Sequence, residues 1–316
     1  MIVGIPKISV LIVSYNQEIV IKRTIESLLC QKDYIYEICI SDDCSTDRTW
    51  DVILEYERMY PDLFKTRRNQ TNIGIFKNVE FTWTMPSGEI VYQLAGDEEC
   101  GDEWFQNVVE YIKNNDIDYK KELFCIYGDY KCVYPNGDSL TCSNKYATSG
   151  VDRLRLYERG LLANRSSCYS INVLNKFLRV SNGRSFIVEN AQDSQLHIFT
   201  QRAYYLPLVG NIYYANIGVS SNMSNDIILE HENTMVYAYE FFKTLGLEIH
   251  HKDKNLPQYN IAKKRFFYKK SFDNLLHLIR CSMSVFDPKF IFITKGIKRT
   301  FFPLLRRFPH KKPMCW

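Results

Sequence analysis

The first hundred residues alternate between continuous apolar runs and segments in which apolar residues recur at helical spacing. Three runs, KISVLIVS (7–14), YEICIS (36–41) and EIVYQLA (89–95), are typical of strands that are covered on both faces. Between them the spacing predicts helices over 18–31, from about 45 to 60 with Ser45 or Thr46 as N-cap, and over 76–85. Strand and helix therefore alternate, which predicts a parallel α/β sheet flanked by helices.

Each predicted strand ends in polar residues. The first is followed by Ser14-Tyr15-Asn16, the second by Asp42-Asp43, and the third by LAGDEECGDE (94–103), which holds five carboxylates. A solvated acidic turn would explain the third cluster by itself, and a bound divalent cation is the alternative, because hard cations prefer oxygen ligands. The carboxyl ends of parallel strands meet at one edge of a sheet, so we expect the three clusters to converge there on a ligand.

The ligand expected at this edge is a nucleotide sugar. The chain has neither the GxGxxG pattern of a dinucleotide site nor the GxxxxGK[ST] pattern of a P-loop, so a diphosphate must be neutralised in another way. A cation held by Asp97 and Glu98 could bridge the diphosphate, while Tyr15 offers a ring face and Asp42 or Asp43 accepts hydrogen bonds from a base or ribose. Purely structural roles are the alternatives: a half-buried tyrosine, and helix capping by the aspartates.

In chain order, PKISVLIVSYNQE, ISDDCSTDRT, NIGIFKN (72–78) and LAGDEEC resemble the family 2 glycosyltransferases of the GT-A fold. The resemblance covers residues 1–105 and implies a Rossmann-like, mostly parallel sheet and an inverting transferase that uses Mg²⁺ or Mn²⁺. It implies that Asp97 and Glu98 are the metal ligands, although Glu98 stands where the family more often has aspartate. The implied nucleotide-binding residues are Val13, Ser14, Tyr15, Asn16, Asp42, Asp43, Asn72, Gly74, Asn78, Gly96 and Asp97.

The second half of the chain resembles the family less. In the family a carboxylate near the opening of a helix removes the proton of the acceptor hydroxyl, and the matching stretch here is IVENAQDSQLHIFTQRA (187–203). Asp193 keeps the Asp-x-x-Leu spacing and is the preferred base, with Glu189 second; an N-capping role is the structural alternative for Asp193. The altered Glu-Asp pair leaves a second function open, a catalytically degenerate nucleotide-sugar-binding subunit of a polysaccharide assembly complex.

Composition and charge add a prediction about location. The chain is 46% hydrophobic and 24% charged, as in soluble globular proteins, and its ten cysteines form no CxxC motif, which favours reduced thiols in the cytoplasm. Residues 285–316 hold eight basic residues and one acid among many apolar side chains. This mixture favours the anionic inner face of a bacterial plasma membrane over a nucleic acid; the structural alternative is a C-terminal helix that packs on the core and exposes its charges to water.

These expectations combine into a domain plan. Residues 1–225 are expected to form the GT-A domain, with a nucleotide-sugar half (1–105) and an acceptor half (106–225). Residues 226–316 are expected to form a helical basic and apolar extension that associates with the membrane. The expected reaction transfers a sugar, with a UDP-sugar as donor, to a glycan or a polyprenyl-diphosphate-linked acceptor during the synthesis of a surface polysaccharide.

Overall fold

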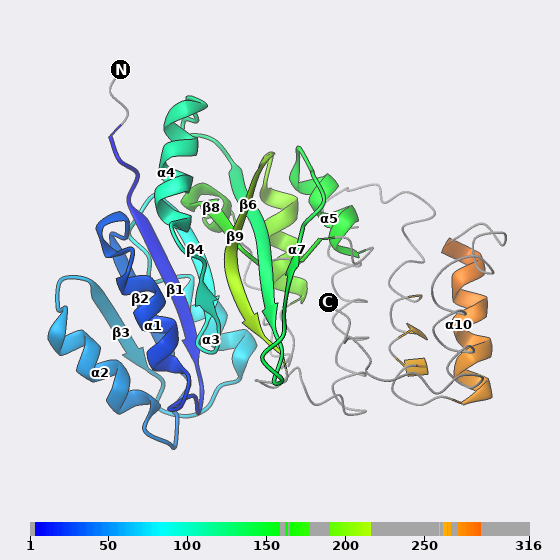
Figure 1. The fold of residues 1–316 in the computed structure, drawn as a ribbon, viewed down its shortest axis with the longest axis horizontal. Coiled ribbons are helices and arrows are strands. Elements are labelled where there is room, and N and C mark those ends of the chain that lie inside the picture. Colours follow the sequence, from blue (N-terminus) through cyan, green and yellow to red (C-terminus); the bar gives the residue numbers. More distant parts are fainter. Residues whose placement is uncertain are drawn as a thin grey trace. The chain divides into compact units, whose positions relative to one another are not determined.

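The computed structural model describes residues 4–158, 162–163, 165–176, 190–215, 259, 262–263, 265–266 and 271–285. Its internal contacts divide the chain into two compact units, Met1–Asn222 and Met223–Trp316. The first unit contains the predicted α/β sheet, with helices packed on both of its faces (Figure 1).

The N-terminal half of the sheet is parallel. Its strands lie in the order β3-β2-β1-β4, so β1 is central and β3 is at the edge. The strands are β1 (Ile8–Ser14), β2 (Glu37–Asp42), β3 (Phe64–Arg68) and β4 (Ile90–Ala95), and the helices between them are α1 (Ile21–Leu29), α2 (Thr49–Met59) and α3 (Ile75–Thr82), with a short 3₁₀ helix η1 (Lys32–Tyr34) before β2.

Three of these strands and all three helices lie where the apolar pattern places them, but two local features differ from the prediction. The edge strand β3 reads FKTRR, and only its first residue, Phe64, is buried, so it carries no apolar run to reveal it. The N-cap prediction is also wrong, since α2 begins at Thr49 with Arg48 as its N-cap. Ser45 instead bonds to Asp42, and Asp47 accepts hydrogen bonds from Thr49, so the loop before α2 is stabilised by its own side chains.

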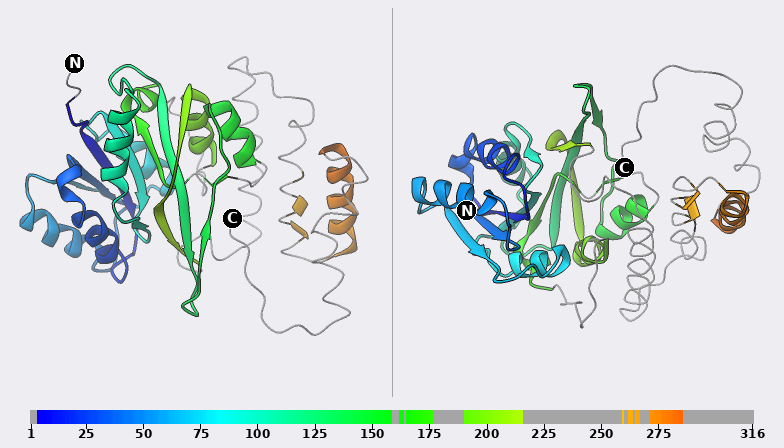
Figure 2. Two further views of the ribbon diagram at one scale, coloured as in Figure 1. Left: turned by 45° about the horizontal axis from the view of Figure 1, so that its top comes forward. Right: turned by 90° about the horizontal axis from the view of Figure 1, so that it is seen from below.

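The C-terminal half of the sheet is mixed. Beyond β4 the order continues β8-β6-β9-β5, and β7 pairs with β6 outside this path. The long strands β6 and β9 are parallel neighbours, and they lie side by side in both views of Figure 2. The strands are β5 (Glu99–Cys100), β6 (Phe124–Val133), β7 (Ser139–Cys142), β8 (Ser167–Ser170) and β9 (Arg202–Tyr214), and the helices are α4 (Trp104–Asn114), α5 (Gly150–Glu158), α6 (Ile171–Leu174) and α7 (Asn190–Phe199).

Alternation along β1 sends its side chains into two separate cores. Ile8, Val10 and Ile12 face one side of the sheet, where α1, α2 and α4 supply a cluster that includes the fully buried Trp104. Leu11 faces the other side, with side chains from the turn after α3, from α6 and from α7. Strand β1 is apolar on both faces because a layer of helices covers each face of the sheet, as the continuous run 7–14 indicates.

The second unit is described only in part. Its described helix is α10 (Phe272–Val285), and Ala262 and Phe266 are buried. The proposed membrane tail from residue 286 onward lies outside the described residues. Among the residues that the structure describes, no helix is both long and apolar enough to cross a bilayer, and the nine cysteines there are free thiols.

Candidate active site

The three polar clusters lie at one edge of the sheet. Ser14 is the register partner of Asp42, and Val13 is the partner of Ala95 on the other side of β1. Backbone hydrogen bonds continue the alignment past the strands, because the N–H of Asp43 donates to Ser14 (2.9 Å) and the N–H of Gly96 donates to Val13 (3.1 Å). The expected convergence of the strand ends is therefore present in the fold.

Asp42 is buried in this edge, with 0% of its surface exposed. Its carboxylate accepts hydrogen bonds from the backbone N–H of Ser45 (2.9 Å) and the hydroxyl of Ser14 (3.2 Å), and the hydroxyl of Ser45 is a further donor. The guanidinium of Arg68 lies 3.6 Å away. These contacts fix the loop after β2, so Asp42 has a structural role in the site. Its suggested place near a ribose stays a prediction.

Asp43 links the end of β2 to the segment before α3. Its two carboxylate oxygens accept the backbone N–H groups of Ile73 and Gly74, each at 2.9 Å, and the side-chain amide of Asn69 donates to it at 2.9 Å. Asn72 also accepts from the N–H of Gly74, at 3.1 Å. Gly74 has φ +86°, a conformation that glycine adopts without steric cost, so this tight approach depends on it.

Asn78 completes the same network from the first turns of α3. Its side-chain oxygen accepts from the hydroxyl of Ser41 (2.6 Å) and the amide of Asn69 (3.0 Å), and its amide donates to the carbonyl of Ser41 (2.9 Å). Asn78 is buried, and its side chain points into the protein toward Ser41 and Asn69. The sequence-predicted residues Asp43, Asn72, Gly74 and Asn78 thus form one connected scaffold.

Tyr15 is the exposed member of the edge, with 44% of its surface accessible. Asn16, the next residue in the turn, has φ +51° and fixes the turn through hydrogen bonds to the loop after β2. The side-chain oxygen of Asn16 accepts from the N–H of Thr46 (2.8 Å), and its own N–H donates to the hydroxyl of Ser45 (2.9 Å). Val13 is buried below. The ring of Tyr15 is therefore available as a stacking face next to the strand ends.

Asp97 follows β4 at this edge. Burial raises the pKa of its carboxyl, and the positive charges of Arg165 and Arg23 act in the opposite direction. The preceding Gly96 packs closely, because a Cβ there would lie 2.2 Å from the side-chain oxygen of Gln17 and 2.9 Å from Cδ1 of Ile21, and both side chains would have to shift. Asp97 forms no ion pair within 4 Å among the described residues, although its charge is partly desolvated.

The next two carboxylates are paired with arginines. Glu98 forms an ion pair with Arg165 and accepts a hydrogen bond from the side-chain amide of Asn211 (2.9 Å). Glu99 lies 2.7 Å from Arg23 and also accepts from the hydroxyl of Tyr214, whose pKa is raised to about 12 by burial and by this bond. Sequence reasoning missed both arginines, since they lie far from the acidic turn in the chain and no local pattern marks them.

A divalent cation fits this turn at Asp97. Mg²⁺ is commonly held by one or two carboxylates together with phosphate oxygens and water, and the partly desolvated carboxylate of Asp97 suits that arrangement. Glu98 could ligate the same ion only if its pair with Arg165 opened. Within the described residues there is no cluster of three or more His, Cys, Asp or Glu side chains that could hold a metal ion.

The candidate bases lie at or next to α7. Asp193 is on this helix, which begins at Asn190, so Asp193 is not its N-cap. Its side chain and all of Glu189 lie outside the described residues. The later part of α7 is anchored in the core by Gln195, Leu196 and His197, which are buried. Burial lowers the pKa of His197 well below its usual value, and the nearby Arg153 guanidinium lowers it further.

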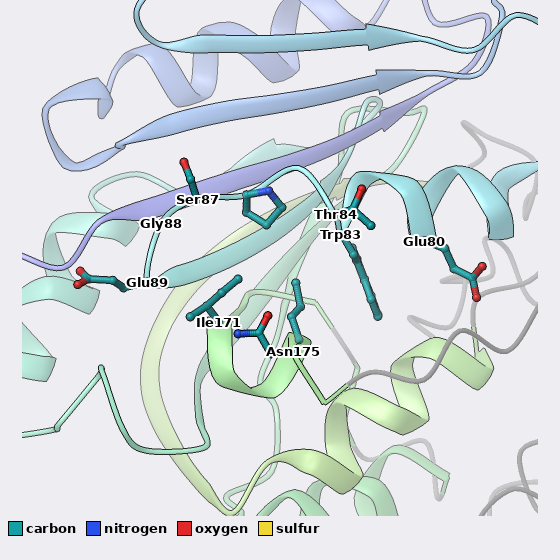
Figure 3. A pocket seen from close by; sticks show the side chains of 10 residues that line it. Glu80, Trp83, Thr84, Ser87, Gly88, Glu89, Ile171 and Asn175 are labelled. Atoms are coloured by element: carbon teal, nitrogen blue, oxygen red, sulfur yellow. The ribbon is translucent and has the colours of Figure 1, made fainter.

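A hollow of about 630 Å³ lies elsewhere, at the end of α3 and the start of β4 (Figure 3). Trp83, Ser87 and Glu89 line one side of it, and Ile171 and Asn175 line the other. Residues 87–89 precede β4, whereas Asp97 follows it, so the hollow belongs to the opposite edge of the sheet. It takes no part in the candidate site.

Comparisons with known proteins agree with the sequence resemblance. Residues 9–120 match the model of the glycosyl transferase family 2. An uncharacterised glycosyltransferase of Nostoc sp. is 36% identical over 113 residues, which cover 35% of this chain and 34% of that protein. Chondroitin synthase of Escherichia coli is 22% identical over 272 residues, covering 85% of this chain and 37% of the synthase. The chain thus spans about a third of the length of these curated relatives.

Solved structures share the fold. The crystal structure of S. aureus TarS 1-349 in complex with UDP-GlcNAc is 19% identical, with a TM-score of 0.58 over 87% of this chain and 79% of that chain. The match to family 2 thus extends over residues 9–120, the chain has the GT-A fold of these solved structures, and the predicted fold class is confirmed.

Proposed function

We propose that this protein is an inverting glycosyltransferase that transfers a sugar from a nucleoside-diphosphate donor, with a UDP-sugar as the expected substrate. The observation that carries the proposal is the convergence of an exposed aromatic ring at Tyr15 and a desolvated carboxylate at Asp97 on one edge of the sheet. The ring can stack on the nucleobase, and the carboxylate can hold the cation that neutralises the diphosphate. The UDP-GlcNAc complex of TarS, which has the same fold, supports the choice of donor.

In the proposed complex the uracil ring stacks on Tyr15 and the sugar diphosphate lies toward Asp97. Mg²⁺ or Mn²⁺, held by Asp97, would neutralise the negative charge that develops on the departing diphosphate. Asp43 and its partners hold the segment 72–78 next to the donor. The carboxylate of Asp43 already accepts three hydrogen bonds from the protein. A hydrogen bond from the nucleobase would therefore use a lone pair of its oxygens that these bonds leave open.

Asp193 is the proposed general base, with Glu189 as the second candidate. A carboxylate in this role removes the proton of the acceptor hydroxyl as that oxygen attacks the anomeric carbon and the nucleoside diphosphate leaves. Help of this kind is worth about 10²- to 10⁴-fold in rate. Anchoring of α7 in the core by Leu196 and His197 would hold the base at a fixed distance from the donor.

The acceptor is proposed to be a glycan or a polyprenyl-diphosphate-linked saccharide in the assembly of a surface polysaccharide such as O-antigen or capsule. The similarity to chondroitin synthase supports a role in polysaccharide synthesis. In this proposal residues 1–105 bind the donor, residues 106–225 the acceptor, and the basic and apolar tail within 226–316 holds the enzyme at the inner face of the plasma membrane.

The proposal is tested by a hydrolysis screen, which needs no knowledge of the acceptor. The purified chain is incubated with UDP-, GDP- and dTDP-sugars in the presence of Mg²⁺, Mn²⁺ or EDTA, and release of the nucleoside diphosphate is measured. We expect slow, cation-dependent hydrolysis of at least one UDP-sugar. Tight binding of a donor with no hydrolysis and no transfer would favour a catalytically degenerate binding subunit, and no binding of any donor would contradict both.

A further inference from the structure

The buried carboxylate of Glu98 is committed to one arginine and one amide. Glu98 is 7% exposed, and its two oxygens face different partners: Arg165 at one and the side-chain amide of Asn211, at 2.9 Å, at the other. A carboxylate this deeply buried is stable as an anion only when it is paired and hydrogen-bonded. Each carboxylate oxygen of Glu98 therefore has a protein partner without a metal.

Strand pairing in the sheet brings Arg165 to the donor edge, the edge at which the carboxyl ends of β1, β2 and β4 meet. Strand β8 runs antiparallel to β4, with Tyr92 opposite Cys168, so the residues that precede β8 lie beside those that follow β4. The guanidinium also stacks on the ring of Tyr213, with Cζ 4.1 Å from the ring centre. In the register of β8 with β4, Arg165 lies beside the residues that lead into Asp97, and so next to the proposed diphosphate position.

The side chain of Arg165 is nevertheless accessible, with 27% of its surface exposed. A guanidinium presents five N–H donors in a planar fork, which matches the geometry of a phosphate, and Glu98 contacts it at one oxygen. Glu98 holds one edge of the guanidinium, and the ring of Tyr213 covers one face. The side chain of Arg165 therefore has less conformational freedom to lose when it binds an anion.

We propose that Arg165 binds the diphosphate of the donor nucleotide and that Glu98 is the residue that positions it. The inference rests on the proposed function and deepens it. It gives Glu98 a role different from metal ligation, and it divides the neutralisation of the diphosphate between a fixed guanidinium and a cation at Asp97. A chain with this arrangement retains part of its affinity for a nucleoside diphosphate when no divalent metal is present.

The test compares the affinities of UDP and UMP by calorimetric titration, in Mn²⁺ and in EDTA, for wild type and three variants. Arg165→Gln should lower the affinity for UDP by about ten- to a hundredfold, the loss expected for a charge-assisted hydrogen bond, and should lower that for UMP much less. Arg202→Gln is the matched control, because Arg202 pairs with Glu122 at 3.4 Å at the start of β9, and it should leave both affinities unchanged.

Glu98→Gln provides an independent variant in case Arg165→Gln does not fold. It retains Arg165 but removes its counter-ion, so it should weaken UDP binding by a smaller factor, and the loss should persist in EDTA, where a metal-ligand role cannot contribute. An unchanged preference for UDP over UMP in Arg165→Gln, or in Glu98→Gln if the first variant is unfolded, would overturn the inference alone. Failure of the wild type to bind UDP at all would instead overturn the proposed function.

Discussion

The N–H of Gly74 donates to the carboxylate of Asp43 across 2.9 Å, and this bond joins the N-cap of α3 to the residue that follows β2. A neighbouring bond from Ile73 to the same carboxylate makes the contact two-pronged. Asp43, one of the residues expected to surround the donor, thus holds the others in segment 72–78 in place. We therefore expect donor binding and local stability to depend on the same side chain.

Asp43→Asn should therefore reduce both stability and donor affinity. The NH₂ group of the amide replaces one of the two oxygens that accept the backbone N–H groups of Ile73 and Gly74, so one of these groups loses its acceptor and we expect a loss of about 2–3 kcal/mol in the free energy of unfolding. Urea unfolding and a UDP titration measure the two effects. Asp51→Asn, at an exposed position of α2, is the control. Loss of UDP affinity at unchanged stability would show that Asp43 serves the ligand and not the loop.

Acid should loosen the part of the fold that contains α7. Burial holds the pKa of His197 well below 6.5, so the unfolded chain binds a proton below that pH and the folded chain does not. Stability attributable to His197 is therefore present above pH 6.5 and lost as pH falls, by up to about 1.4 kcal/mol per unit. His197→Gln should flatten this dependence between pH 6.5 and 5 in urea unfolding. An equally steep dependence in the variant would refute the assignment, and the difference at pH 8 measures packing alone.

Asp193→Asn should reduce turnover by at least about a hundredfold while leaving donor affinity nearly unchanged, because a general base acts in the transition state. Donor hydrolysis is a suitable assay, since water then takes the place of the acceptor. Glu189→Gln is the paired variant and should cost less. If the order of the two effects is reversed, Glu189 is the base.

Removal of residues 290–316 should release the protein from anionic vesicles without abolishing donor hydrolysis. Each Lys or Arg that reaches the surface contributes roughly 1 kcal/mol, and burial of the intervening apolar side chains adds a part that salt does not screen. In co-sedimentation, high salt should weaken the binding of the full chain only partly. Vesicles of neutral lipid are the control, and equal binding by both chains would rule out the tail as the membrane contact.

Local pattern was sufficient to predict the parallel half of the sheet and its polar edge. The runs that became β1, β2 and β4 are apolar because both of their faces are covered, and strand ends meet wherever parallel strands align. Strand β3 was missed because an edge position leaves its lysine and arginines partly in solvent. The partners of the acidic turn were missed for another reason: Arg165 reaches Glu98 only through the pairing of β8 with β4.

The donor edge is tested most directly by hydrogen–deuterium exchange of the backbone amides with and without saturating UDP and Mn²⁺. We predict that UDP slows exchange in residues 13–16, 41–46, 72–78 and 95–100, where the ends of β1, β2 and β4 meet the loop before α3. Exchange in 83–89 and 171–175, which line the hollow at the opposite edge, should not change. Protection confined to those two segments, with none at the strand ends, would contradict the proposed site.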